Sequence, residues 1–243
     1  MDVMLPNWLT GSQQGLSDSN ADERHVVLGT PLKAPLMEDQ EEIVFGCGCF
    51  WGAEKGFWRL PGVVSTAVGY AGGQTPSPSY EQVCSGRTGH TEVVRVVYST
   101  PAIDVSDLLK LFWECHDPTQ GDRQGNDRGS QYRSAIYTTT TRQMQLALAS
   151  RDWYQQALTQ AERDSITTEI AADRTFHFAE NYHQQYLARP GSRPYCSAMP
   201  TGILLGAFEA ADYQLPSQVW THYDWSISHC VLRGDNNPIQ LQA

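Results

Sequence analysis

The sequence places a cysteine, Cys49, where a short apolar strand gives way to a helix. We expect the strand over residues 43–46 and the helix over residues 50–60. The unpaired N–H groups and the positive dipole end of a helix favour a thiolate over a thiol, and the thiolate is the reactive species. Phe50 and Trp51, directly beside the cysteine, indicate an apolar pocket for a small uncharged group. The pattern therefore predicts a nucleophilic or redox-active Cys49.

Two polar loops, residues 80–92 and 121–133, supply further groups of the kind found in active sites. Glu92 stands at the start of an apolar strand, where an ionised carboxylate would be costly without a partner. Burial raises the pKa of a carboxyl group, and a protonated carboxyl donates a proton at neutral pH. Glu92 is thus a candidate proton donor. The hydroxyls of Tyr80 and Tyr132 are candidates to donate hydrogen bonds beside it.

Strand and helix patterns alternate along the chain, which predicts an α/β (α+β) fold, a two-layer sandwich of helices on a mixed sheet. Long polar insertions at 72–91 and 117–132 exceed ordinary loop lengths, and such loops are usually functional or disordered. Apolar periodicity predicts further strands at 63–70, 93–98, 134–138 and 166–171. It also predicts three further helices. One carries Val105, Leu108, Leu109 and Phe112 on one face, and the others lie at 141–160 and at 179–187.

We expect three regions along the chain. Residues 1–24 are rich in Ser, Gln, Asp and Asn without periodicity, which is typical of a flexible leader. Residues 25–190 are predicted to form the catalytic domain. Residues 191–243 are irregular and rich in Pro, Ser and Gln, so we expect a long tail that wraps the body and carries recycling cysteines.

Composition excludes several classes of function. The 243 residues carry a net charge of −10, which argues against a protein that holds nucleic acid or an anionic membrane. The sequence lacks an apolar stretch of roughly 20 residues that would span a bilayer, and it lacks a secretory signal pattern. We therefore expect a cytoplasmic protein. In that compartment its six cysteines are expected to be catalytic, redox-active or buried rather than a static disulfide framework.

Seven short motifs follow one another along the chain. They are Gly48-Cys49-Phe50-Trp51-Gly52, Gly69-Tyr70-Ala71-Gly72-Gly73, Glu81-Gln82-Val83-Cys84-Ser85-Gly86, Gly89-His90-Thr91-Glu92, Gln124-Gly125-Asn126-Asp127, Gln131-Tyr132-Arg133-Ser134 and Tyr182-His183-Gln184-Gln185-Tyr186. Together they resemble a known family, the A-type peptide methionine sulfoxide reductases. Any one motif is weak, but seven in the family's order are very specific. The resemblance runs from about residue 25 to about residue 196.

The resemblance implies a role for each catalytic candidate. Cys49 attacks the sulfur of methionine S-sulfoxide, free or within a protein, and is left as a sulfenic acid. Glu92 donates the proton that the sulfoxide oxygen needs, and Tyr80 and Tyr132 hold that oxygen. Asp127 matches a family residue near the substrate and is expected to orient it. Phe50 and Trp51 are expected to enclose the substrate methyl group.

The resemblance also implies how the enzyme is recycled. A second thiol condenses with the sulfenic acid to a disulfide, which thioredoxin reduces. Cys196 occupies the family's first recycling position. Many relatives have another cysteine a few residues later, but residues 199–206 contain none, and the only later cysteine is Cys230. We expect a relay from Cys49 to Cys196 and then to Cys230, in a monomer without bound cofactor or metal.

The other cysteines have simpler interpretations. Cys47, Cys84 and Cys115 are expected to pack in the interior, although a protective role for Cys47 stays open. Two rival functions also stay open. A cysteine hydrolase would need His90, His116 or His183 as its base. A zinc module would use soft ligands from Cys47, Cys49, Cys115-His116 and Cys196, but structural zinc sites usually show C-x₂₋₄-C pairs, which the sequence lacks.

Overall fold

A six-stranded sheet forms the centre of the protein, with the strand order β7-β6-β1-β3-β2-β8. The computed structural model describes residues 23–228 and 230–241, and the side chain of Cys230 lies outside that description, as does most of the predicted leader. The strands of the sheet are β1 (Gln40–Cys47), β2 (Val63–Ala71), β3 (Thr91–Ser99), β6 (Ser134–Thr138), β7 (Glu169–Ala172) and β8 (His177–Phe178), and a separate hairpin joins β4 (Arg123–Gln124) and β5 (Asp127–Arg128).

The sheet is mixed, as the sequence predicts. β7 runs parallel to β6, whereas the pairs among β6, β1, β3, β2 and β8 are antiparallel. The register sets Tyr70 of β2 opposite Glu92 of β3, and Cys47 of β1 opposite Ser134 of β6. Residues with expected chemistry therefore gather at one end of the central strands.

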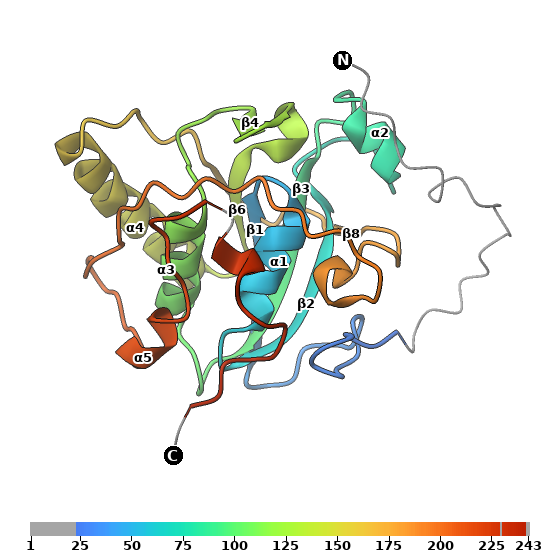
Figure 1. Cartoon of the computed structure of the whole chain (residues 1–243), viewed down its shortest axis with the longest axis horizontal. Coiled ribbons are helices and arrows are strands. Elements are labelled where there is room, and N and C mark those ends of the chain that lie inside the picture. The colour runs from blue at the N-terminus through green and yellow to red at the C-terminus, as the bar shows by residue number, and fades with distance from the viewer. Residues whose placement is uncertain (1–22, 229, 242–243) are drawn as a thin grey trace, which may run out of the picture.

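Helices cover one face of this sheet (Figure 1). α1 packs against β2 and β3, while α4 packs against β6 and β7 and contacts α3. The N-cap residue Asp104 begins α3 in a capping box with Asp107, which supplies acceptors for the free N–H groups of the first turn. The helices are α1 (Phe50–Trp58), α2 (Tyr80–Cys84), α3 (Val105–Cys115), α4 (Thr141–Gln160) and α5 (Ser217–Trp220), with 3₁₀ turns η3 (Ser130–Tyr132), η4 (Tyr186–Ala188) and η5 (Cys230–Leu232).

The alternation of strand residues produces two unequal apolar faces. On the helix side, the Phe45 ring stacks on Phe57 of α1 at 4.8 Å and on Phe112 of α3 at 5.3 Å, between ring centroids. The main core continues from there beneath all three large helices. The opposite face holds only a small cluster around Val44, Val93 and Tyr137. The predicted two-layer α/β arrangement is therefore confirmed.

One predicted helix is wrong. Residues 179–187 form turns and the short η4, because Gln185 adopts a left-handed conformation with φ of 48°. The buried side chain of Gln184 donates to the carbonyl of Val68 and accepts from its N–H, so this segment is bound to β2 by side-chain hydrogen bonds. The predicted strand at 166–171 begins later, as β7, and the short elements α2, β4, β5 and β8 were not predicted.

The C-terminal tail crosses over α1 and α3 (Figure 1). Buried carboxylates on α3 accept hydrogen bonds from its backbone: Glu114 binds Leu205 N at 2.6 Å, and Asp107 binds Gln214 N at 2.9 Å. Burial raises the pKa of Asp107 to about 6, so the group is mostly ionised at neutral pH and is a strong acceptor. The irregular tail is thus fastened by the regular helix beneath it.

None of the helices within the described residues is both long enough and apolar enough to cross a membrane.

We predict that Asp107→Ala lowers the free energy of unfolding by about 2 kcal/mol or more, since buried backbone N–H groups lose their acceptor. Urea unfolding would measure this change. Asp107→Asn keeps an acceptor oxygen and should cost less. Asp152→Ala removes an exposed acid of α4 and serves as the control. Equal stabilities of the Asp107→Ala and Asp152→Ala proteins would contradict this account of how the tail is held.

Candidate active site

Cys49 is the N-cap residue of α1, and Gly48 alone separates it from the end of β1. The turn between strand and helix needs glycine at position 48, where φ is 85°. A Cβ atom at Gly48 would lie 2.5 Å from Cβ of Gln124, so the loop that carries Gln124 approaches the backbone here. The close approach leaves Cys49 only 8% exposed. The sequence therefore predicts the place of this cysteine correctly, but the structure buries it more deeply than a helix N-terminus alone would suggest.

The prediction that Cys49 is a thiolate is wrong for the protein without substrate. Burial raises the pKa of the Cys49 thiol well above its ordinary value, and the nearby Glu92 and Asp127 raise it further. The backbone N–H of Trp51 lowers the pKa, as expected at a helix N-terminus, but it does not offset desolvation. Cys49 rests as a thiol, so its chemistry depends on where its proton goes.

Glu92 lies beneath the first turn of α1. Its side chain is 2% exposed, and Oε2 accepts a hydrogen bond from Phe50 N at 3.0 Å. Burial raises the pKa of Glu92 to about 8, the Phe50 N–H opposes this increase, and Asp127 adds to it. The raised pKa expected for Glu92 is therefore found. At neutral pH the group is mostly protonated, which makes it an acid next to a buried thiol.

Tyr80 and Tyr132 approach Glu92 from α2 and η3. Burial and then the charge of Glu92 raise the pKa of both hydroxyls, and Cys49 adds to the effect on Tyr132. Both hydroxyls therefore stay protonated and can donate hydrogen bonds. The N–H of Tyr80 donates to Glu180 at 2.9 Å, which fixes the start of α2. Both predicted tyrosines therefore lie close enough to Glu92 to feel its charge, and Tyr132 also lies near Cys49.

Asp127 of β5 completes the polar group. Its Oδ1 accepts a hydrogen bond from the Tyr195 hydroxyl at 2.5 Å, while Oδ2 is buried without a partner. A buried carboxylate oxygen without a hydrogen bond is costly, so it requires an explanation. Because Asp127 acts electrostatically on both Cys49 and Glu92, this free acceptor stands beside the reactive groups, where a polar ligand atom would satisfy it.

Aromatic rings form the other side of the site. Trp51 stacks on Tyr186 at 4.0 Å, and its Nε1 donates to Nδ1 of His183 at 3.3 Å. That bond leaves the proton of the neutral imidazole on Nε2, which is buried without a partner. Burial lowers the pKa of His183 to about 3, so the ring is uncharged. Phe50 lies 5.3 Å from the same ring, which gives the apolar surroundings that the sequence predicts.

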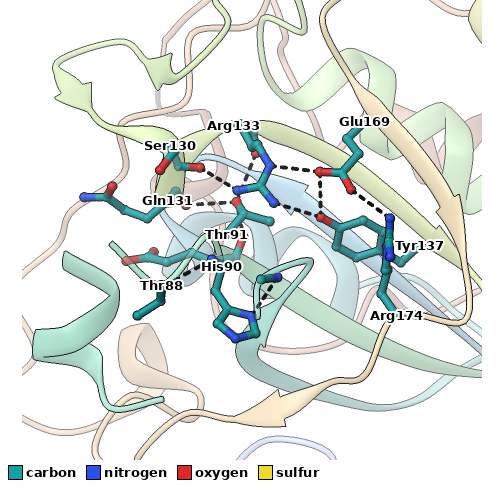
Figure 2. Close-up of polar contacts among 11 residues, drawn as sticks. Thr88, His90, Thr91, Ser130, Gln131, Arg133, Tyr137, Glu169 and Arg174 are labelled. Atoms are coloured by element: carbon teal, nitrogen blue, oxygen red, sulfur yellow. Dashed lines mark hydrogen bonds and ion pairs between the residues drawn. The ribbon is translucent and has the colours of Figure 1, made fainter. Parts of the chain in front are cut away.

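Hydrogen bonds hold the two site loops against each other (Figure 2). The Thr91 hydroxyl, one residue before Glu92, donates to the Gln131 carbonyl at 2.9 Å and also contacts the Arg133 carbonyl. Arg133 in turn donates to Ser130 O and forms an ion pair with Glu169 of β7. The residues on either side of Tyr132 are therefore bonded to the start of β3, which fixes the hydroxyl relative to Glu92.

Cys196 is brought to the site by the tail. A Cβ atom at Gly52 would lie 2.5 Å from its Sγ, so the Cys196 thiol rests on the first turn of α1, where only glycine leaves room for it. Cys49 and Cys196 interact electrostatically, and burial raises the pKa of Cys196 to about 12. The side chain of Cys230 lies outside the described part of the structure.

Comparisons with known proteins identify the family. Residues 41–208 match the family described as peptide methionine sulfoxide reductase. The chain belongs to this family. A reductase of Salinispora arenicola is 60% identical over 183 residues, which cover 74% of this chain and 83% of the relative. One from Vibrio cholerae is 56% identical over 201 residues, which cover 83% of this chain and 93% of the relative.

A solved structure agrees with this assignment. Methionine sulfoxide reductase A of Corynebacterium diphtheriae has 46% sequence identity and a TM-score of 0.67, and the match covers 76% of this chain and 89% of that one. Mxr1 of Saccharomyces cerevisiae in reduced form has 33% identity and a TM-score of 0.58, over 65% of this chain and 90% of that one. The chain is accordingly an oxidoreductase with the fold of the peptide methionine sulfoxide reductases.

Several residues of the reductase site have no role in the sequence prediction. Tyr70 donates to Glu180 at 3.0 Å, and Glu180 also anchors Tyr80. The motif at 182–186 belongs to the resemblance, yet its His183 had been considered only as a base for hydrolysis. Tyr195, next to Cys196, ties the tail to Asp127. Periodicity could not reveal these contacts, because they join segments that are distant in the chain.

We predict that Glu92 makes the free energy of unfolding of this reductase depend on pH. Its pKa is about 8 in the folded protein, against an ordinary value of 4.5, so the folded state binds more protons between these values. The stability that the protonated Glu92 contributes is then fully present below pH 4.5 and is lost as pH rises through 8. Glu92→Gln should therefore become more stable relative to wild type by about 2 kcal/mol between pH 6 and pH 8.

Urea unfolding of both proteins at the two pH values would test this prediction. Glu81→Gln, which changes an exposed acid on α2, is the matched control. A Glu92→Gln protein whose stability follows that of wild type across this range would show that Glu92 is ionised at neutral pH.

Proposed function

We propose that the protein reduces methionine S-sulfoxide, free and within proteins, to methionine and thereby repairs oxidised proteins. The observation that carries the proposal is the pair formed by the Cys49 thiol and the buried Glu92, whose pKa of about 8 keeps it protonated at neutral pH. Reduction of a sulfoxide needs both a sulfur nucleophile and a proton for the oxygen. Family membership supports the same reaction.

In the proposed reaction, protons and oxygen balance within the site. Glu92 donates its proton to the sulfoxide oxygen while the Cys49 sulfur attacks the substrate sulfur. The resulting Glu92 carboxylate takes up the thiol proton. The sulfur–oxygen bond of the substrate breaks, the hydroxyl transfers to Cys49, and methionine departs. Cys49 is left as a sulfenic acid, and Glu92 is protonated again.

The remaining groups are proposed to position the substrate. Tyr80 and Tyr132 donate hydrogen bonds to the oxygen, since the high pKa of each hydroxyl keeps it protonated. Phe50 and Trp51 enclose the methyl group. Asp127 orients the substrate through its unpartnered Oδ2, which can accept a hydrogen bond from a substrate N–H group.

Recycling is proposed to run through the tail. The Cys196 thiol attacks the Cys49 sulfenic acid, which forms a disulfide and releases water. The position of Cys196 against Gly52 supports this step. Thioredoxin then reduces the disulfide, either directly or after transfer to Cys230. Peptide mapping without reductant would test that order, because a Cys49–Cys230 bond formed without Cys196 contradicts it.

The hydrolase alternative is less well supported. The candidate bases are engaged elsewhere: Nδ1 of His90 contacts Gly73 N, Nδ1 of His116 contacts Phe112 O, and Nδ1 of His183 accepts from Trp51. His183 is the histidine beside the site, and its pKa of about 3 makes it a weak base. A cysteine hydrolase needs a base that accepts the thiol proton.

We predict turnover with methionine S-sulfoxide and none with the R epimer in the presence of thioredoxin, its reductase and NADPH. NADPH consumption and methionine formation would be measured together. Cys49→Ser should abolish both signals. A stoichiometric amount of methionine without turnover would keep the Cys49 chemistry and reject thioredoxin as reductant. A complete lack of methionine would reject the proposed function.

A second prediction concerns the contact between Gly52 and Cys196. Gly52→Ala should slow formation of the Cys49–Cys196 disulfide by about tenfold, since its Cβ would displace Cys196 Sγ and overpacking costs about 1–3 kcal/mol. Loss of free thiols after one turnover would be followed in a quenched time course. Gly56→Ala is the matched control, because its Cβ would approach Leu111 Cδ2 to 3.3 Å and Val231 Cγ1 to 3.7 Å, with no contact to Cys196 within 4 Å among its nearest atoms. Equal rates in both variants would place Cys196 elsewhere during catalysis.

A further inference from the structure

Three thiols other than the nucleophile face one internal cavity. Cys47 from the end of β1, Cys115 from the end of α3 and Cys196 from the tail line a space of about 10 Å³, together with apolar side chains and the glycines of α1. The cavity is too small for a substrate. It provides room for sulfur atoms to move by the short distance that bond formation requires.

Cys47 and Cys115 are close neighbours. Their Sγ atoms and a ring nitrogen of His116 all lie within 4.8 Å of one another, and all three residues are buried. The contact with Cys47, followed by burial, raises the pKa of the Cys115 thiol, while His116 lowers it in part. The sequence predicts packing for Cys47 and Cys115, with a protective role open for Cys47, and it does not reveal their proximity because β1 and α3 are far apart in the chain.

The cluster resembles a metal site by composition, but the histidine is not available as a ligand. Nδ1 of His116 lies 2.8 Å from the Phe112 carbonyl, which only accepts, so this nitrogen carries the proton. Nε2 contacts the Ser134 hydroxyl at 2.8 Å. A nitrogen must present a lone pair to bind zinc, and both ring nitrogens are occupied. The two thiols are left as a pair whose natural chemistry is oxidation to a disulfide.

We propose that Cys47 and Cys115 are a reserve dithiol that accepts the disulfide formed between Cys49 and Cys196. This inference rests on the proposed reductase function. Cys196 is the link, because it interacts electrostatically with Cys49 on one side and with Cys115 on the other, and it lines the same cavity as the buried pair. The protein then stores the electrons for a second reduction in its core.

The transfer takes two exchange steps. Cys115, as the thiolate, attacks Sγ of Cys196 in the Cys49–Cys196 disulfide and expels the Cys49 thiolate. Cys47, as the thiolate, then attacks Sγ of Cys115 and expels the Cys196 thiolate. Each attacking thiol loses a proton and each expelled thiolate gains one. The result is a Cys47–Cys115 disulfide with Cys49 and Cys196 reduced, and the oxidant is the first methionine sulfoxide.

The surroundings fit such a relay. Nδ1 of His116 lies 3.9 Å from Cys115 Sγ and partly offsets the increase in the pKa of that thiol. Cys47 and Cys115 are at most 5% exposed, and Cys196, with the same 5% exposure as Cys115, lines the pocket beside them. The electrons return through Cys196, which attacks Cys115 Sγ once it has itself been reduced.

The test counts methionine formed per reduced enzyme without any reductant. The parent protein would carry Cys84→Ser and Cys230→Ser, so that Cys47, Cys49, Cys115 and Cys196 are its only thiols. We expect about two equivalents, since each disulfide stores two electrons. The matched double variant, in which Cys47→Ala and Cys115→Ser are added, should give about one. Peptide mapping of the parent after one equivalent should find the Cys47–Cys115 disulfide.

The single variant Cys47→Ala provides an independent readout, because it should trap the Cys115–Cys196 disulfide. It decides the question even if the double variant does not fold. One equivalent from the parent, with Cys47 and Cys115 still reduced, would overturn the reserve dithiol but leave the proposed function intact. No methionine from the parent would overturn both. Stoichiometric zinc that blocks both thiols in the purified protein would replace the redox proposal with a metal site.

Discussion

The active site depends on one buried carboxyl group beneath the first turn of α1. Glu92 accepts the Phe50 N–H, which fixes the helix start relative to β3. The low dielectric of this position keeps the group protonated and also keeps the Cys49 thiol from ionising. A helix N-terminus normally promotes a thiolate, but desolvation is the larger effect here. The site therefore rests as two neutral acids, which in the proposed reaction become reactive when a substrate oxygen accepts the proton.

Cys47, Cys115 and Cys196 are also buried, so their reactions depend on which thiols lie close together rather than on access to solvent. Cys196 lies near Cys49 because glycine at position 52 leaves space on α1 and because the tail is held across the helices. The buried acids Asp107 and Glu114 hold that tail through its backbone N–H groups. The hydrogen bonds of Asp107 and Glu114 thus support the proposed recycling step, although both residues lie far from the reacting atoms.

Short segments with strong patterns could be predicted from the sequence. The bounds of α4 and the existence of the strands β1, β2, β3 and β6 follow from periodicity. The predicted helix at 179–187 failed, because its apolar spacing reflects contacts with β2 rather than a helical repeat. Side-chain hydrogen bonds from Gln184 replace the regular backbone ladder there.

For the site itself, the sequence determined the reactive residue types and their positions at element ends. Only the tertiary structure decided their ionisation, since the pKa of Glu92 and of Cys49 is set by desolvation from segments distant in the chain. It also decided which cysteines meet. Cys47 and Cys115 belong to separate local patterns and become neighbours only when α3 packs on β1. Local patterns carry no information on such contacts, because packing depends on the whole core.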